Sequence, residues 1–188
     1  MTTKYCSAEL LLALAALRPL GCQGNGSASS SRADARNAEM MKMPAAMNDG
    51  EFASMMVMHH KGAIEMGRYE AQDGTRTEVR DLAGTMADSQ SAENVNLMDV
   101  VRETGHGNMK ADPPVQENMG RCMTALRSAG GVQVDSVFLT HMIKHHTMGV
   151  DMARKAMPNL KRNDTRLMAK TMIDDQTREI AQSRGMVN

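Results

Sequence analysis

The feature that most constrains the fold of this chain is an internal repeat. Residues 49–66, DGEFASMMVMHHKGAIEM, align without a gap on residues 135–152, DSVFLTHMIKHHTMGVDM, at an offset of 86 residues (135 − 49). The same offset aligns residues 82–93 on residues 168–179, so the second segment of each copy keeps its register with the first. A match at a single offset indicates a duplicated structural unit.

Each copy contains two apolar segments that have helical spacing and few β-branched or aromatic residues. The first segment of each copy opens with an acidic residue, Asp49 or Asp135, which we expect to cap its helix. Turn-forming residues follow at 73–76, at 104–114 and around Pro158. The two αα-hairpins predict an all-α four-helix bundle, with a short additional helix near residues 115–129.

The first 22 residues have the pattern of a secretory signal peptide. Lys4 precedes an apolar stretch at residues 10–17, which is too short to span a bilayer. The order Leu-Gly-Cys ending at Cys22 is similar to a bacterial lipoprotein cleavage box, in which the cysteine is lipidated. We therefore expect an exported protein of the periplasm or cell envelope that meets the membrane only through a lipid anchor.

The rest of the chain divides into a tether and one domain. Residues 23–47 are rich in Gly, Ser and Ala at their start and predict a flexible tether. Its Met-rich end, residues 40–47, is either a soft-metal scavenging segment or a linker. Residues 48–188 form the duplicated helical domain, with repeats at about 49–103 and 135–188.

The composition points to thioether chemistry. The chain has 21 Met, no Trp, 2 Tyr and 2 Phe, so an aromatic core is excluded. A single Met is usually core packing, but so many indicate a further role. Lys plus Arg and Asp plus Glu both number 22, which leaves no basic excess for nucleic acid. Three cysteines are too few for a disulfide framework.

Met and His follow helical stripes in both copies. At about 100° per residue, the adjacent histidines of each His-His pair point in two directions, and each has Met on its own stripe. His and Met one turn apart can share an ion, and the softness of imidazole with thioether favours copper(I), with silver(I) as a mimic, over zinc. The predicted metal ligands are Met55, Met56, His59, His60, Met66, His141, Met142, His145, His146, Met148 and Met152.

Two further groups leave alternatives open. The second helix of each copy carries Met, Gln and Glu at i, i+4 and i+7, which either orient the imidazoles and add donors or simply pack and bridge helices. Cys122 with Met119 and Met123 forms either a small soft site or ordinary packing. The residues of the first group are Met86, Gln90, Glu93, Met172, Gln176 and Glu179.

The pattern D-x-x-F-x-x-x-M-x-x-H-H-x-x-A-x-x-M, followed by a helix with Q-x-x-E, resembles the DUF305 family of exported bacterial proteins over about residues 49–186. The resemblance implies a ferritin-like four-helix bundle and periplasmic copper binding and resistance through Met and His. The chain departs from the family at Gly149, where the first copy has Ala63, and by having no His near Thr77 or Asn163.

The leading hypothesis is a protein that sequesters or buffers copper(I) outside the cytoplasm for homeostasis or resistance. No catalytic step is needed, and the ion either stays bound or passes to a copper-transfer protein. The alternatives are a copper(I)-oxidising enzyme and a metal-free structural or interaction bundle. A di-iron site would need Glu-x-x-His on two helices, whereas the motif occurs once, at residues 103–106, in a predicted turn. The second copy is richer in donors, so we expect the main site there.

Overall fold

The structure, a computed structural model, describes residues 47–106, 113–131 and 133–187. Its α-helices are α2 (Asp49–Asp73), α3 (Thr77–Glu103), α4 (Pro113–Ser128), α5 (Gln133–Ala156) and α6 (Asn163–Met186), and a short 3-10 helix, η1 (Met157–Asn159), follows α5. The predicted all-α fold of two duplicated hairpins is confirmed. The signal peptide, Cys22 and residues 40–46 lie outside the described residues.

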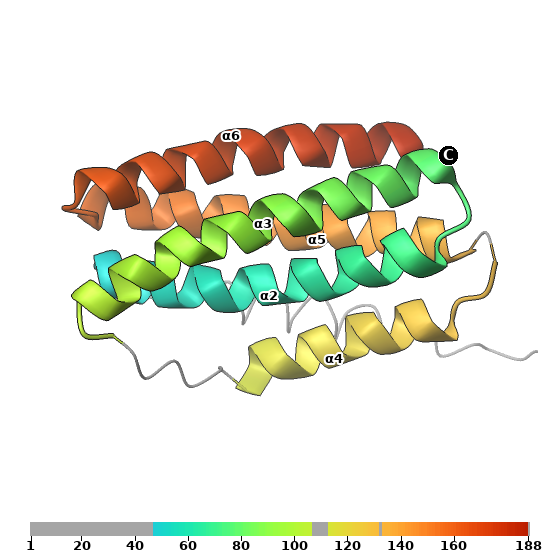
Figure 1. Ribbon diagram of the computed structural model, residues 1–188, viewed down its shortest axis with the longest axis horizontal. Helices are drawn as coiled ribbons and strands as arrows, with labels where there is room; N and C mark the ends of the chain where they lie inside the picture. The colour runs from blue at the N-terminus through green and yellow to red at the C-terminus, as the bar shows by residue number, and fades with distance from the viewer. Residues whose placement is uncertain (1–46, 107–112, 132, 188) are drawn as a thin grey trace, which may run out of the picture. The chain divides into compact units, whose positions relative to one another are not determined.

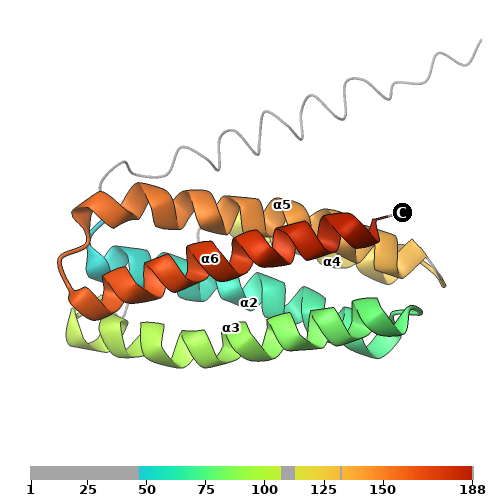
Figure 2. The same cartoon turned by 90° about the horizontal axis from the view of Figure 1, so that it is seen from above.

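The helices pack as two hairpins and one additional helix. α2 packs along α3, and α5 packs along α6. The two hairpins contact each other mainly through α2 and α5 (Figures 1 and 2). α4 belongs to neither repeat and contacts α2 and α5, on the opposite side of α2 from α6 in Figure 1. Among the described helices, we find none with the length and apolarity needed to cross a membrane.

The start of α2 corrects one expectation from the sequence. Asn48, not Asp49, caps α2: its side chain accepts a hydrogen bond from the Glu51 amide, and the Glu51 carboxylate accepts one from the Asn48 amide. This reciprocal capping box satisfies amides that the first helical turn leaves unpaired. Asp49 is therefore free to contact another part of the bundle.

Asp49 and Asp135 instead join the two hairpins to each other. Asp49 on α2 accepts hydrogen bonds from the amides of Lys161 and Arg162, at the start of α6, at 3.1–3.2 Å. Asp135 on α5 accepts the corresponding bonds from Thr75 and Arg76, at the start of α3. Neither α3 nor α6 has a side-chain cap of its own, so each begins on a carboxylate from the other hairpin.

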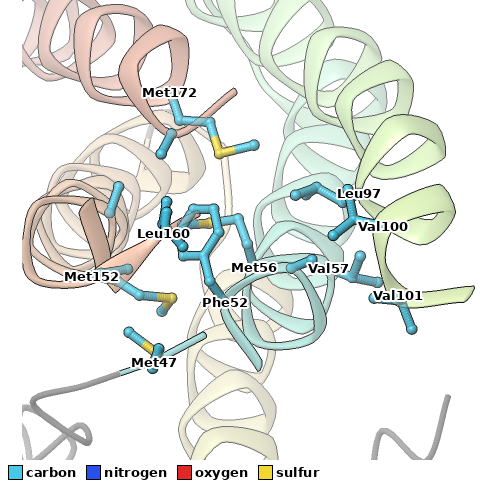
Figure 3. Close-up of a cluster of buried hydrophobic side chains, with 14 residues drawn as sticks. Met47, Phe52, Met56, Val57, Leu97, Val100, Val101, Met152, Leu160 and Met172 are labelled. Carbon is cyan, nitrogen blue, oxygen red and sulfur yellow. The ribbon is translucent and has the colours of Figure 1, made fainter. Parts of the chain in front are cut away.

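Two apolar clusters fill the bundle. The first is built around Phe52 and the second around Phe138, its counterpart in the other copy, and both rings are fully buried. Thioethers take much of the space that aromatic rings would otherwise fill. The buried methionines of the first cluster are Met47, Met56, Met152 and Met172 (Figure 3), and those of the second are Met66, Met86, Met123 and Met142.

Candidate metal site

A layer of polar side chains separates the two apolar clusters. On α2, residues 52–57 belong to the first cluster and residues 63–66 to the second, and the His-His pair lies between them. The other three repeat helices change from apolar to polar at the same level. We call the following residues the polar layer: His59 and His60 from α2; Gln90, Glu93 and Asn94 from α3; His145 and His146 from α5; Gln176 and Glu179 from α6.

His59 and His145 meet at the contact between α2 and α5. Their rings stack with centroids 3.8 Å apart and planes inclined by 5°. The Nε2 atom of His145 also lies 3.0 Å from the carbonyl oxygen of His59, within hydrogen-bond distance. Because these residues occupy equivalent positions in the repeat, the stack lies where the two copies meet.

The other histidine of each pair points toward the second helix of its own hairpin. His60 Nδ1 lies 3.1 Å from Asn94 Oδ1, and His60 Nε2 lies 3.4 Å from Glu93 Oε2. In the second copy, His146 Nε2 lies 2.8 Å from Glu179 Oε2. The two imidazoles of each His-His pair thus point in different directions, as predicted, and the carboxylates of Glu93 and Glu179 lie beside His60 and His146. Met86 and Met172 pack in the apolar clusters.

Burial keeps the imidazoles of His59, His60 and His145 neutral. It lowers the pKa of His59 well below the usual value, an effect that the adjacent His145 strengthens. Burial lowers the pKa of His60 to about 4 and that of His145 to about 3. Burial, together with the nearby Asp175 and Glu179, raises the pKa of Glu93 to about 7. A neutral imidazole keeps a nitrogen lone pair for a metal ion.

Several buried atoms of the layer have no hydrogen-bond partner among the described residues. They are Nε2 of His59, Nε2 of His60, both ring nitrogens of His146, and both amide atoms of Gln90 and of Gln176. The Nε2 atoms of His60 and His146 lie 3.4 and 2.8 Å from carboxylate oxygens but form no hydrogen bond with them. Each such group costs about 1–3 kcal/mol, a cost that an apolar side chain of the same shape would avoid. Nitrogen atoms left unpaired at this cost are candidate ligands for a bound ion.

The predicted methionine ligands are divided between the two clusters. Met56 and Met152 lie in the first cluster and Met66 and Met142 in the second, so each cluster holds one thioether from each copy. Met55 is partly buried against the first cluster, and Met148 is partly buried on α5. Four of the predicted imidazoles thus lie between two clusters that hold predicted thioethers, whereas His141 lies outside the layer, with Nδ1 3.3 Å from Cys122 Sγ.

Two features of the layer were not predicted from the sequence. Asn94 contacts His60, although its only sequence signal is its place beside Glu93 on the inward stripe of α3. Gly149, noted as a departure from the family pattern, leaves room for the layer: a Cβ atom there would lie 2.7 Å from His59 Nε2 and 2.3 Å from Gln176 Oε1.

Imidazole and carboxylate alone do not complete a metal site here. Within the described ranges, no three His, Cys, Asp or Glu side chains are grouped so as to hold a metal ion. An ion bound by the layer would need thioether or amide donors to complete its shell, and thioethers select soft ions.

Comparisons with known proteins agree with the repeat. The family model described as "Domain of unknown function (DUF305)" matches residues 21–102 and again residues 98–187. A search of curated proteins found no match.

Solved structures share the fold. A DUF305 protein from Streptomyces coelicolor, assigned as secreted, is 25% identical, with a TM-score of 0.66, over 74% of this chain and 91% of its own. A DUF305 fragment from Deinococcus radiodurans is 21% identical, with a TM-score of 0.68, over 77% and 96%. CopM in its Cu(I)-bound form is 26% identical, with a TM-score of 0.64, over 74% and 95%. CopM also has Cu(II)-bound, silver-bound and apo structures.

Proposed function

Because the chain belongs to the DUF305 family, whose model matches both of its halves, we propose that it binds copper(I) and sequesters it outside the cytoplasm. The observation that carries this proposal is the polar layer, in which His59 stacks on His145 and both lie, with His60 and His146, between two apolar clusters that are rich in methionine. Imidazole with thioether is a ligand set for a soft monovalent ion. The silver(I) ion should bind as a mimic.

The structural relatives support a copper-related role. CopM, which shares 25–27% identity with this chain, has structures with Cu(I), Cu(II) and silver. Its similarity extends over at least 93% of its own length, so the likeness covers the bundle and not a fragment of it. Sequestration, as opposed to transport or chemistry, is our own inference for this chain.

The proposal requires no catalytic step. Buried histidines between packed helices hold an ion away from water, which limits its reaction with oxygen and favours storage over turnover. Oxidation of copper(I) by oxygen, measured on the loaded protein, should be no faster than that of the free ion. A faster, saturable rate would instead favour a copper-oxidising enzyme.

Titration with copper(I) against a competing chelator tests the binding. The chain should take up copper(I), and the double variant His145→Ala/His146→Ala should bind it at least about tenfold more weakly. His106→Ala is the matched control, because His106 lies in the turn after α3, with Nδ1 near the carbonyl oxygen of Thr104. Equal affinity in the double variant and in the unaltered chain would refute the proposal.

Export and anchoring are a separate part of the proposal. The relative from Streptomyces coelicolor is assigned as secreted, in keeping with the signal-peptide pattern of residues 1–22. We propose that Cys22 carries the lipid anchor. In cells, radiolabelled fatty acid should be incorporated into the unaltered chain and not into Cys22→Ser; labelling of both would exclude this anchor.

A further inference from the structure

Helix α4 brings sulfur to one side of the pair formed by α2 and α5. It lies outside both repeats and contacts these two helices. Met123 is buried in the second cluster, Cys122 packs against that cluster, and Met119 is partly buried. α4 therefore places a thiol and a thioether beside the donor-rich stripe of α5, in an arrangement that the duplication does not repeat.

The thiol of Cys122 lies against an imidazole of that stripe. Its Sγ atom is 3.3 Å from Nδ1 of His141, and both side chains are partly buried. Cys122 is a free cysteine. A thiolate and an imidazole that already face each other are a ligand pair for a soft ion of low coordination number.

Met119 connects this pair with the polar layer. A Cβ atom at Gly62 would lie 2.5 Å from Met119 Sδ and 3.1 Å from Cε1 of His145. The absence of a side chain at Gly62 thus lets a thioether from α4 approach the stacked imidazole. Sulfur and nitrogen donors therefore extend from the partly exposed Cys122 to the buried stack.

A metal ion could engage both members of the pair at once. A soft ion can replace the proton of a thiol such as that of Cys122 and bind its sulfur together with the imidazole nitrogen of His141, which already lies beside it.

We propose that Cys122 and His141, with Met119 beside them, form a second soft-metal site that binds copper(I) or silver(I) at the edge of the polar layer. This inference deepens the proposed function and rests on it. Binding forms a metal–sulfur bond and releases the thiol proton to solvent, and no electron is transferred. The pair offers one thiolate and one imidazole, which is too few for zinc and sufficient for a monovalent ion.

The test uses the full chain with Cys6→Ser and Cys22→Ser, which leaves Cys122 as its sole thiol. Silver(I) is added against a competing chelator, and thiolate-to-metal absorption is followed in the near ultraviolet, where a chain without Trp absorbs weakly. At saturation the band should have the intensity of one thiolate-bound ion per chain, and that ion should protect the thiol from alkylation. Cys122→Ser should lose the band and one bound ion.

The contribution of the histidine separates a built site from any accessible thiol. His141→Ala keeps the thiol and should weaken the silver-dependent band at least about tenfold, whereas Thr140→Ala, an exposed neighbour, should not. An unchanged band affinity in His141→Ala, or an unchanged ion count in Cys122→Ser, overturns the second site.

The same titrations distinguish this inference from the proposed function. If the second site fails while His145→Ala/His146→Ala still loses copper(I), only the inference is overturned. If the double histidine variant keeps its affinity and Cys122→Ser loses an ion, the second site stands and the polar-layer site falls. If the parent chain binds neither ion, both are overturned.

Discussion

Replacing Gly149 by Ala should crowd the polar layer, even though the repeat places Ala63 at the equivalent position. The added Cβ would lie 2.7 Å from His59 Nε2 and 2.3 Å from Gln176 Oε1, both closer than real Cβ contacts allow. Neither neighbour can move into solvent, because His59 is 6% and Gln176 2% exposed. Moving the His59 ring would also disturb its stack on His145.

The magnitude follows from two opposing terms. Overpacking a well-packed interior costs about 1–3 kcal/mol. Replacing Gly by Ala inside a helix contributes about 0.8–1.0 kcal/mol of stability, so the net loss is about 0–2 kcal/mol. Gly84→Ala on α3 is the matched control, because its nearest neighbour, the Cβ of Ala71, is at an ordinary 3.8 Å. Gly84→Ala should therefore gain only the stability that Ala contributes over Gly inside a helix.

The difference between the two variants isolates the crowding. Their free energies of unfolding should differ by about 1–3 kcal/mol, with Gly84→Ala the more stable. Urea unfolding followed by far-ultraviolet circular dichroism is a suitable assay, since the chain has no Trp to report by fluorescence. Gly149→Ala should also bind copper(I) more weakly than the control. If Gly149→Ala proves as stable as Gly84→Ala, the space we assign to His59 and Gln176 is wrong.

Three other perturbations test the bundle and its charges. Asp135→Ala should lower the free energy of unfolding by about 2–3 kcal/mol, because it removes a buried carboxylate that accepts hydrogen bonds from Thr75 and Arg76. Glu78→Ala, which removes an exposed ion pair with Arg76, should cost clearly less in the same urea assay. Similar losses would contradict the joining role of Asp135. Burial and the neighbouring Asp135 raise the pKa of Glu70 to about 8. The folded state therefore holds a proton that the unfolded chain releases near the usual carboxyl pKa of 4.5, so the free energy of unfolding should decline as pH rises from about 4.5 to 8. Glu70→Gln should flatten that decline by at most about 1.4 kcal/mol per pH unit in thermal unfolding, and an unchanged slope would exclude this assignment. Because the pKa values of His60 and His145 are lowered to about 4 and about 3, the copper(I) affinity of Cys122→Ser, which lacks the thiol proton of the second site, should fall by less than about threefold between pH 7 and pH 5. A loss above about tenfold in this variant would indicate imidazoles that titrate normally.

The sequence predicts the bundle because residues that are equivalent in the repeat also make equivalent contacts in the structure. The contact of His60 with Glu93 and that of His146 with Glu179 are related by the offset of the repeat. The contacts that Asp49 and Asp135 make with the other hairpin are related in the same way. Helical periodicity determines which side chains share a face, and this is enough to predict that the two histidines of each pair point in different directions.

Periodicity does not determine what meets across a helix contact. The stack of His59 on His145 depends on how α2 approaches α5, and the Cys122–His141 contact depends on a helix outside the repeat. The change in the role of Asp49, from an expected cap to a link between hairpins, has the same origin, since Asn48 one residue earlier already supplies the cap. These contacts are tertiary, and a single stretch of sequence carries no signal for them.

The carboxylates of Asp49 and Asp135, each of which binds the other hairpin, also determine what would happen if the chain were cut between its repeats. Because α3 begins on Asp135 and α6 begins on Asp49, a chain cut between the repeats would leave each half with bare amides at its second helix. One repeat alone could recover a carboxylate acceptor by pairing with another copy of itself. Each hairpin thus supplies the capping acceptor of the other, and a single hairpin moved into another protein would lack it.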